Sequence, residues 1–249
     1  MKRILIGVAA VMLVAVMSGP VLAGSQTDAV IALHLQTHLQ KGDPCTVDPA
    51  TQGTACSDYV LQGDLLTSYD LYLMVAQGNP VPGVGAISCG IVYNDGGCGA
   101  TTLDDAFGVD VFSWQLCTSG LDFPNGCLPG VENEWPASGG GNRITWDVSL
   151  DCRTTGPGTD GVQACAGVFY VYAYDQDYFQ ITPNNNLVSG IPELQVGDCN
   201  NAVSNLLVTQ TGFVWFSTGA TEQGCNPCLT DCIPIAVENT TWGQIKRRY

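Results

Sequence analysis

The chain has 249 residues, of which 23 are acidic and only eight are lysine or arginine, so its formal net charge is −15 at pH 7. Such an acidic surface repels phosphate backbones, because nucleic-acid affinity comes mainly from basic side chains that neutralise phosphates. The composition therefore excludes nucleic acid as a partner. The chain has only two histidines and no Gly-x-Ser-x-Gly turn, so it also lacks most of the residue arrangements that hydrolases use for catalysis.

The first residues have the pattern of a cleavable export signal. A short positive segment precedes an apolar run over residues 4–16, and small residues lead up to Ala23. The run is too short to cross a membrane, so residues 1–23 are predicted to be a secretory signal peptide. The mature chain from Gly24 then has six basic residues against 23 acidic ones, a formal charge of −17. We expect it outside the cell or at the cell surface, with the periplasm as the alternative, and without a transmembrane span.

Alternating apolar residues predict strands along the whole mature chain. The predicted strands are 28–36, 69–76, 85–93, 108–116, 142–150, 166–174, 205–208 and 212–217. The run 142–150 alternates throughout, and Phe112, Trp114 and Leu116 are predicted to share one face of their strand. About eight strands, no long amphipathic helix and many Gly- and Pro-bearing turns predict an all-β fold, an Ig-like antiparallel β-sandwich.

The composition shifts near Thr218, where cysteines crowd together. We therefore expect one sandwich domain over 24–217 and, over 218–249, a Cys-rich extension that ends in a short basic and aromatic tail. The first run, 28–36, could be helical by residue propensity, but its continuous, partly β-branched character favours a strand.

All cysteines lie in the mature chain, and an even number in an exported protein most simply forms disulfides, here six. The twelve are Cys45, Cys56, Cys89, Cys98, Cys117, Cys127, Cys152, Cys165, Cys199, Cys225, Cys228 and Cys232. Spacing does not determine connectivity, but it is compatible with neighbour pairs: Cys45–Cys56, Cys89–Cys98, Cys117–Cys127 and Cys152–Cys165. The last three cysteines could supply only three zinc ligands, with no histidine adjacent, so a disulfide cluster is the favoured interpretation.

The two histidines, His34 and His38, are four residues apart. On a helix they would share a face and could bind a metal as a pair. On a strand they would also share a face, but about 13 Å apart, too far to chelate one ion. Ordinary polar roles are the prediction.

Acidic side chains near predicted strand ends offer two further kinds of site, although solvated loop residues are the simpler interpretation. Calcium takes carboxylate and carbonyl oxygens from loops, and Asp104, Asp105 and Asp110 are candidate ligands. No other cofactor is expected. Two carboxylates in a cleft can hydrolyse a glycosidic bond, and Asp175 with Asp177 is one such pair.

The strand 166–174 carries the clearest binding signal. Tyr170, Tyr172 and Tyr174 fall on one face, while the alternate positions suit a core. An exposed row of tyrosines would offer amphipathic rings to a glycan or a protein. Packing beneath a loop or a second sheet is the commoner fate of such a row, and the strand propensity of tyrosine favours that interpretation.

The last ten residues, TTWGQIKRRY, are basic and aromatic, unlike the acidic body. A short helical turn there would group the apolar side chains apart from the basic ones. These residues are Trp242, Ile245, Lys246, Arg247, Arg248 and Tyr249. The pattern indicates a docking or address segment, with a frayed terminus as the alternative. The ending resembles the Thr-Trp-Gly-x-Ile-Lys-x-x-Tyr terminus of exported, uncharacterised bacterial proteins.

Residues 69–94 and 112–117 resemble the early strands of cohesin-type Ig-like modules. That resemblance implies a sandwich that binds protein partners. The sequence thus predicts a secreted, non-catalytic surface or extracellular module for adhesion, assembly, or recognition of a protein or glycan. A secreted carboxylate-dependent glycoside hydrolase is the alternative. Acids that converge in a cleft lined by Trp114 or Trp135 would favour the enzyme.

Overall fold

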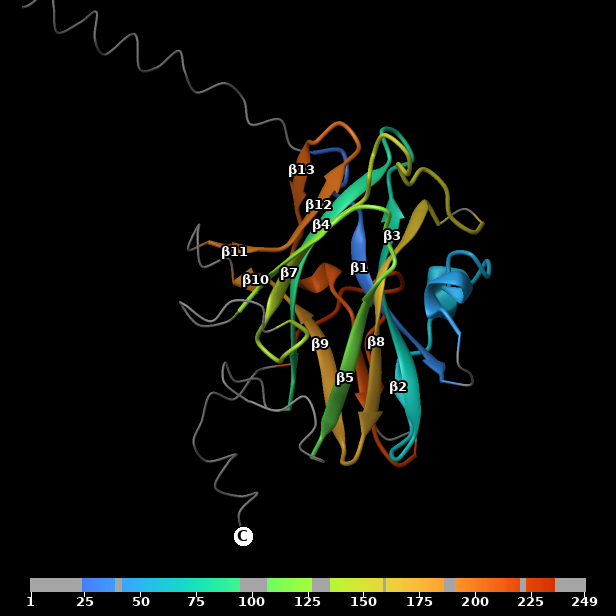
Figure 1. Ribbon diagram of the computed structural model, residues 1–249, viewed down its shortest axis with the longest axis vertical. Helices are drawn as coiled ribbons and strands as arrows, with labels where there is room; N and C mark the ends of the chain where they lie inside the picture. The colour runs from blue at the N-terminus through green and yellow to red at the C-terminus, as the bar shows by residue number, and fades with distance from the viewer. Residues whose placement is uncertain are drawn as a thin grey trace, which may run out of the picture.

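The computed structural model describes residues 24–38, 42–94, 107–126, 135–158, 160–185, 191–219 and 223–235. Within these ranges the chain consists of strands and short 3-10 turns, arranged as two sheets packed face to face (Figure 1). The predicted all-β sandwich is confirmed. The predicted signal peptide and the basic and aromatic tail lie outside the described residues.

The first sheet, sheet A, is antiparallel with the strand order β1-β3-β8-β5. Its strands are β1 (Val30–Thr37), β3 (Ser68–Gly78), β8 (Val162–Ala173) and β5 (Val109–Leu116). The apolar run in β1 is a strand rather than a helix, and its first six residues are buried on both faces. A strand that is buried on both faces reads as a continuous apolar run instead of an alternating one.

The second sheet, sheet B, is built around β4, which pairs with β7, β9 and β12. Its strands are β2 (Gln62–Gly63), β4 (Val84–Tyr93), β6 (Asp122–Asn125), β7 (Gly141–Thr145), β9 (Asp177–Thr182), β12 (Gln195–Asp198), β13 (Val203–Asn205) and β14 (Phe213–Phe216). A small ribbon and three 3-10 turns complete the described elements: β10 (Asn184–Asn185), β11 (Pro192–Glu193), η1 (Pro44–Val47), η2 (Cys56–Asp58) and η4 (Val208–Gln210).

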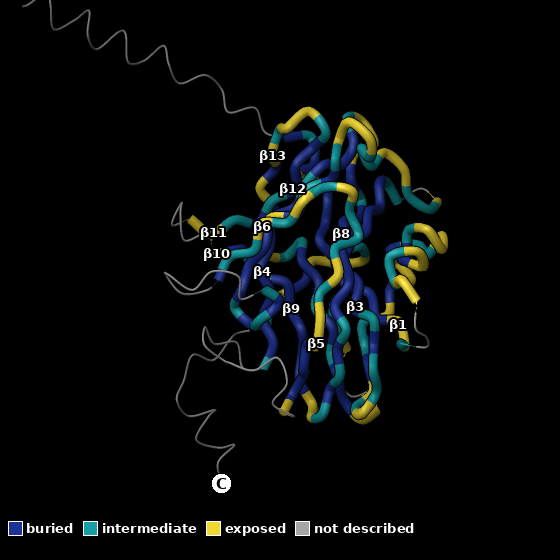
Figure 2. Tube along the Cα trace, in the orientation of Figure 1, coloured by how far each residue is buried: buried dark blue, intermediate teal, exposed yellow. Residues whose placement is uncertain are grey.

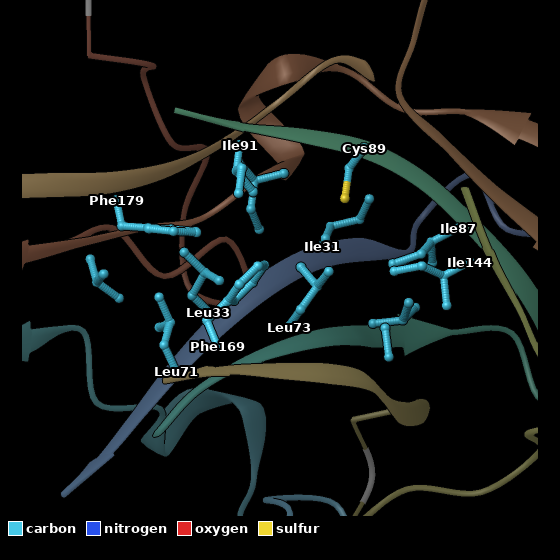
Figure 3. Close-up of a cluster of buried hydrophobic side chains, with 14 of the residues drawn as sticks. Ile31, Leu33, Leu71, Leu73, Ile87, Cys89, Ile91, Ile144, Phe169 and Phe179 are labelled. Carbon is cyan, nitrogen blue, oxygen red and sulfur yellow. The ribbon is translucent and has the colours of Figure 1, made fainter. Parts of the chain in front are cut away.

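The main hydrophobic core lies between the two sheets (Figure 3). Sheet A contributes Leu33, Leu73 and Phe169 to it, while sheet B contributes Ile91 and Phe179, and all five are at most 1% exposed. Each such side chain contributes about 1.5–3 kcal/mol on burial. Exposed residues gather instead in the turns at both ends of the sandwich and in the segment 42–59 beside β1 (Figure 2).

The predicted strand 142–150 ends early, at Thr145. Its alternation continues in sequence, but Val148 is 36% and Leu150 83% exposed. The Asp147 carboxylate accepts hydrogen bonds from the backbone N–H and the hydroxyl of Ser149, and the Asp147 carbonyl accepts the N–H of Leu150. An aspartate that bonds its own backbone two residues ahead starts a turn, and this turn ends the strand.

The predicted alignment of Phe112, Trp114 and Leu116 is also wrong in part. A register shift in the pairing of β5 with β8 falls between Val111 and Ser113. One extra residue reverses the facing of the side chains that follow it. Phe112 therefore lies exposed on the outer face, whereas Trp114 packs against the core.

The disulfides connect distant parts of the chain rather than neighbours. The four described pairs are Cys45–Cys117, Cys56–Cys228, Cys152–Cys199 and Cys225–Cys232. The suggested pairings Cys45–Cys56, Cys117–Cys127 and Cys152–Cys165 are therefore wrong, and so is Cys89–Cys98, because Cys89 is free. The favoured interpretation of the C-terminal trio as a disulfide cluster is confirmed, because all three cysteines are disulfide-bonded.

Two cysteines, Cys89 and Cys165, are free and buried, so the expectation that all twelve form disulfides is wrong for them. Cys89 points from β4 into the main core (Figure 3), and burial raises its thiol pKa to about 12. Cys165 faces the opposite side of sheet A, where burial likewise raises its pKa. Cys98 and Cys127 lie outside the described residues.

Candidate functional site

The outer face of sheet A is covered over one half and open over the other. Residues 42–59, which we call the lobe, pack on the covered half together with the Cys-rich segment 223–232. In Figure 1 the lobe is the blue coil beside β1. Beneath it lies a second, smaller core cluster, formed by Val30, Ala32, Cys56, Tyr59, Tyr72, Met74, Ala76, Cys165 and Val168.

Covalent and polar contacts hold this cover in place. The Cys45–Cys117 disulfide joins the lobe to the end of β5, and the Cys56–Cys228 disulfide joins it to the Cys-rich segment. The Tyr72 hydroxyl donates to the lobe's Pro44 carbonyl at 3.2 Å. Because two disulfides attach the lobe to the rest of the chain, the division of the outer face into a covered half and an open half is fixed covalently.

The open half carries the predicted tyrosine row. Tyr170, Tyr172 and Tyr174 are each half-buried on the outer side of β8, and the alternate residues of that strand are buried in the core, as predicted. The ring centroid of Tyr170 lies 5.5 Å from that of Phe112, and those of Tyr172 and Tyr174 are 4.7 Å apart. We call the surface formed by these four side chains the aromatic face.

A histidine–aspartate pair borders the aromatic face. The Nδ1 atom of His38 lies 2.9 Å from the Asp70 carboxylate, and its ring centroid is 4.8 Å from that of Tyr170. The Tyr170 hydroxyl donates to the hydroxyl of Ser68 at 3.2 Å. Both ends of the Tyr170 side chain are thus fixed by neighbours on β3 and beyond the end of β1, which limits the entropy lost when a ligand binds.

The other histidine is a buried neutral group. The backbone N–H of Val60 donates to Nδ1 of His34 at 3.0 Å, and the rings of Tyr59 and Tyr72 pack around it. Burial lowers the pKa of His34 to about 4. His34 lies in β1, whereas His38 follows its last residue, and the two rings contact different groups.

A pocket of about 380 Å³ opens where the lobe meets the open half of sheet A. His38 and Asp70 line it from the sheet, and Asp43, Thr46 and Gln52 line it from the lobe. One oxygen of Asp43 accepts the Cys45 backbone N–H at 3.0 Å. Asp43 and Asp70 bring two carboxylates to this pocket, which lies directly beside the aromatic face, while Pro44 and Val47 give it apolar lining.

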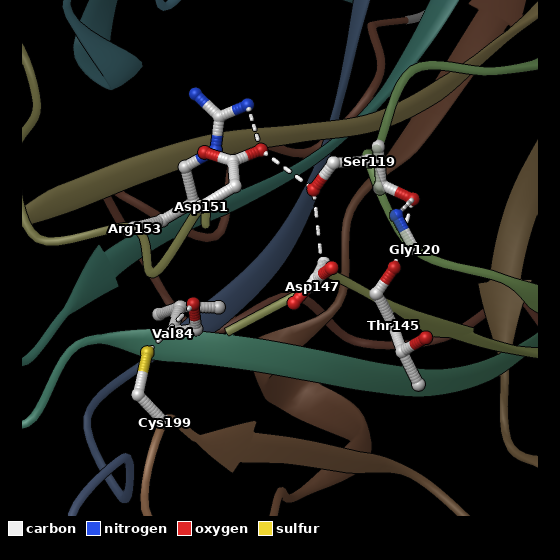
Figure 4. Close-up of polar contacts among 9 residues, drawn as sticks. Val84, Ser119, Gly120, Thr145, Asp147, Asp151, Arg153 and Cys199 are labelled. Carbon is white, nitrogen blue, oxygen red and sulfur yellow. Dashed lines mark hydrogen bonds and ion pairs between the residues drawn. The ribbon is translucent and has the colours of Figure 1, made fainter. Parts of the chain in front are cut away.

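The described basic residues do not offset this acidity. Arg143 contacts Glu193 at 2.6 Å, and Arg153 contacts Asp151 at 2.9 Å. Figure 4 shows the second pair within a polar network, in which the Ser119 hydroxyl donates to the Asp151 carboxylate. Each guanidinium is therefore engaged with its own carboxylate.

In the described part of the chain, the predicted calcium ligands do not form a site. Asp104 and Asp105 lie outside them, and Asp110 is completely buried in β5. Within the described ranges, no group of three or more His, Cys, Asp or Glu side chains is arranged to hold a metal ion. The calcium site therefore remains a prediction for Asp104 and Asp105.

The acids and tryptophans named for a glycosidase do not converge. Asp175 is exposed in the turn after β8, whereas Asp177 is 4% exposed and accepts the backbone N–H of Asn94 at 3.1 Å. Trp114 and Trp135 pack edge-on against each other, 5.3 Å apart, and against the main core. This tryptophan pair is core packing and does not line a cleft around Asp175 and Asp177. Glu132 and Glu134, a further pair of closely spaced acids in the sequence, fall outside the described residues.

Sequence reasoning missed the half-open sheet, the pocket and the His38–Asp70 contact. Their residues lie far apart in sequence and meet only through strand pairing and long-range disulfides. The one local signal was the tyrosine alternation in β8. In the part of the chain that the structure describes, no helix has the length and hydropathy needed to cross a membrane.

No protein-family model matches the chain, and no curated protein matches it by sequence. Among solved structures, a cohesin module from a Clostridium perfringens family 33 glycoside hydrolase matches with 7% identity and a TM-score of 0.38, over 76% of this chain and 98% of that one. A type II cohesin domain from the Acetivibrio cellulolyticus cellulosome matches with 9% identity and a TM-score of 0.35, over 75% and 94%. A type II cohesin–X-dockerin complex from the same organism matches with 8% identity and a TM-score of 0.31, over 76% and 96%. These values are too low to assign the chain to a family or to support a function.

Proposed function

We propose that this protein is an exported, non-catalytic recognition module, and that the aromatic face with its adjoining pocket is its binding surface. The observation that carries the proposal is the half-open outer face of sheet A. Two disulfides hold a cover over one half, while four aromatic side chains remain accessible on the other. Tyrosine is enriched among the few hot-spot residues that carry most of the binding energy in protein interfaces.

The geometry favours a protein ligand over a glycan. Sugar stacking requires a flat ring face that is open to solvent, but these rings lean on one another. The planes of Tyr172 and Tyr174 are inclined at 57°, and those of Tyr170 and Phe112 at 40°. The surface is thus a ridged patch rather than a platform. Because the mature chain is strongly acidic and the pocket contains Asp43 and Asp70, the expected partner surface carries lysine or arginine.

A selection experiment tests this proposal and does not require the natural partner to be identified. A displayed random peptide library is selected on mature protein, with counter-selection on the Tyr170→Ala/Tyr172→Ala variant. We expect enriched peptides to contain basic residues and to bind the variant at least ~30-fold more weakly, the effect of losing a tyrosine hot spot of about 2 kcal/mol.

The control is Phe123→Ala, which removes a more exposed ring, 50% accessible, from β6 in the other sheet. It should leave peptide affinity unchanged, and thermal unfolding should verify that all variants are folded. A glycan array is probed in parallel with the same proteins. Peptides that bind wild type and the double variant equally would refute the aromatic face as the binding surface, and binding confined to glycans would refute the protein partner.

A further inference from the structure

A second pocket, which we call the His34 pocket, opens between the lobe and the end of β1. Its volume is about 510 Å³, which is within the range of small-molecule sites. Residues 34–37 line it from β1, Pro49 and Thr54 line it from the lobe, and Val60 lines it from the segment before β2. It adjoins the pocket beside the aromatic face and shares part of its rim, but the lining of that other pocket does not include His34.

The hydrogen bond between Val60 and His34 determines which nitrogen of the ring carries the proton. The Val60 N–H donates to Nδ1, so Nδ1 is the acceptor and the proton of the neutral ring lies on Nε2. Burial keeps the ring neutral by lowering its pKa to about 4. No described residue accepts a hydrogen bond from Nε2, and this nitrogen is not one of the described polar atoms that are buried without a partner. The Nε2–H group is therefore a free donor that a ligand can reach from the pocket.

The buried part of the pocket lining is apolar apart from this donor. Leu35, Pro49 and Tyr69 are all buried there. The Tyr69 hydroxyl is already engaged, because it accepts the backbone N–H of Asp64 at 2.8 Å. A ligand group that enters this part of the pocket thus meets one hydrogen-bond donor within an apolar surface.

The outer part of the lining is polar but uncharged. Gln36, Thr37 and Gln52 are exposed, and Thr54 is half-buried. In the described part of the chain, no hydrogen bond engages the side chains of these four residues, and none of the lining residues is Asp, Glu, Lys or Arg. Amide and hydroxyl groups both donate and accept, as the hydroxyls of a sugar do. A charged ligand would lose hydration here without gaining an ion pair.

We propose that the His34 pocket binds a neutral N-acetylated sugar, with its acetamido group against the buried lining and its hydroxyls at the polar rim. The acetamido carbonyl accepts the Nε2–H of His34, and the methyl group packs against the aliphatic side chains of Leu35 and Pro49. The inference is independent of the aromatic face, because it concerns a different pocket and a different class of ligand.

An extended peptide is the less suitable occupant. Such a peptide binds by adding a strand to a free sheet edge. The outer edge of β1 is already partly paired, because the Leu35 N–H donates to the Val60 carbonyl at 2.9 Å and the Ile31 carbonyl accepts the Gly212 N–H at 2.9 Å. Side-chain groups, rather than a row of free backbone groups, therefore dominate what the pocket offers.

The test is a titration of mature protein that carries isotope-labelled histidine with N-acetylglucosamine, followed by NMR of the imidazole signals. The chain has only two histidines, so the His38→Asn variant assigns both. We expect the Nε2–H signal of His34 to shift with a dissociation constant of about 1 mM, as the usual affinity per atom gives for a ligand of about 15 non-hydrogen atoms. Glucose, which has a hydroxyl in place of the acetamido group, should bind at least ~10-fold more weakly because Nε2–H then lacks its acceptor.

Two variants test the pocket by calorimetry. His34→Asn keeps an acceptor for the Val60 N–H, but its shorter side chain has no donor at the position of Nε2, so affinity should fall about 10-fold. Val60→Trp places a large ring at the pocket and should abolish binding. Its matched control is Val203→Trp on β13, since the two valines are 48% and 46% exposed. Thermal melts verify that each variant is folded.

The Tyr170→Ala/Tyr172→Ala variant should bind N-acetylglucosamine as wild type does, so failure of this proposal is distinguishable from failure of the aromatic face. Three results would overturn the proposal: N-acetylglucosamine leaves the His34 signals unmoved, glucose binds equally well, or Val60→Trp binds the sugar like wild type. Because Val60 is largely exposed, this last variant remains informative even if His34→Asn does not fold.

Discussion

Acidification is expected to destabilise this protein through one buried side chain, His34. The imidazole is 9% exposed, and its Nδ1 atom accepts the Val60 N–H, so folding holds it in the neutral form. Its pKa is lowered by burial to about 4, against about 6.5 in an unfolded chain. Because the folded-state pKa is the lower one, the unfolded state binds the proton more readily. Stability from this group is present above pH 6.5 and is lost as the pH falls toward 4.

The size of the effect follows from the two pKa values. A difference of about 2.5 units corresponds to about 3 kcal/mol when the loss is complete below pH 4, and to about 2 kcal/mol between pH 7 and pH 5. Other titrating groups also contribute, so the informative quantity is a difference between proteins. In His34→Asn the amide oxygen can still accept the Val60 N–H but does not titrate.

The assay is urea unfolding of wild type and His34→Asn at pH 7 and pH 5. Wild type should lose about 2 kcal/mol more than the variant on acidification, since the contributions of the remaining titrating groups cancel in the comparison. His34→Gln, measured in the same way, tests whether the result depends on the replacement chosen. If wild type and both variants lose the same free energy, the reasoning about burial at His34 is refuted.

Three further predictions concern the covalent framework and the core. Replacing both Cys56 and Cys228 by serine should lower the free energy of unfolding by about 5 kcal/mol, because the disulfide closes a loop whose ends are 172 positions apart and so restricts the unfolded chain; denaturant titration would measure the loss. Cys89 and Cys165 should resist a thiol reagent in native protein and react after unfolding, as peptide mapping of labelled sites would reveal; rapid native labelling would contradict their burial. Phe169→Ala should cost about 3–5 kcal/mol, because the ring is fully buried between the sheets, and a loss below about 1 kcal/mol would contradict that placement.

Strand alternation made much of sheet A predictable. The assignments of β3 and β8, and of β4 in sheet B, follow from apolar periodicity, while that of β1 follows from its continuous apolar run. Phe169 faces the core while Tyr170 faces outward, as the period of two requires. The same rule failed where a local event interrupted it. The bulge in β5 turned Phe112 outward, and the turn at Asp147 ended β7, neither of which periodicity alone can register.

The disulfides mark the limit of sequence reasoning most clearly. Pairing of neighbouring cysteines is compatible with their spacing, yet Cys56 finds its partner 172 positions away. Spacing along the chain says little about separation in space once strands from distant segments lie side by side. The same limit hid the pocket, whose Asp43 and Asp70 come from the lobe and from β3.

The sequence by itself determined the all-β class, the strands of sheet A and the alignment of the three tyrosines on one face, because these depend on side-chain patterns within a few residues. Only the tertiary structure decided which half of the outer sheet is covered, which cysteines stay reduced and which pocket meets the free ring nitrogen of His34. Those features arise from contacts between segments far apart in the chain, whose meeting depends on the packing of the whole sandwich rather than on any local pattern.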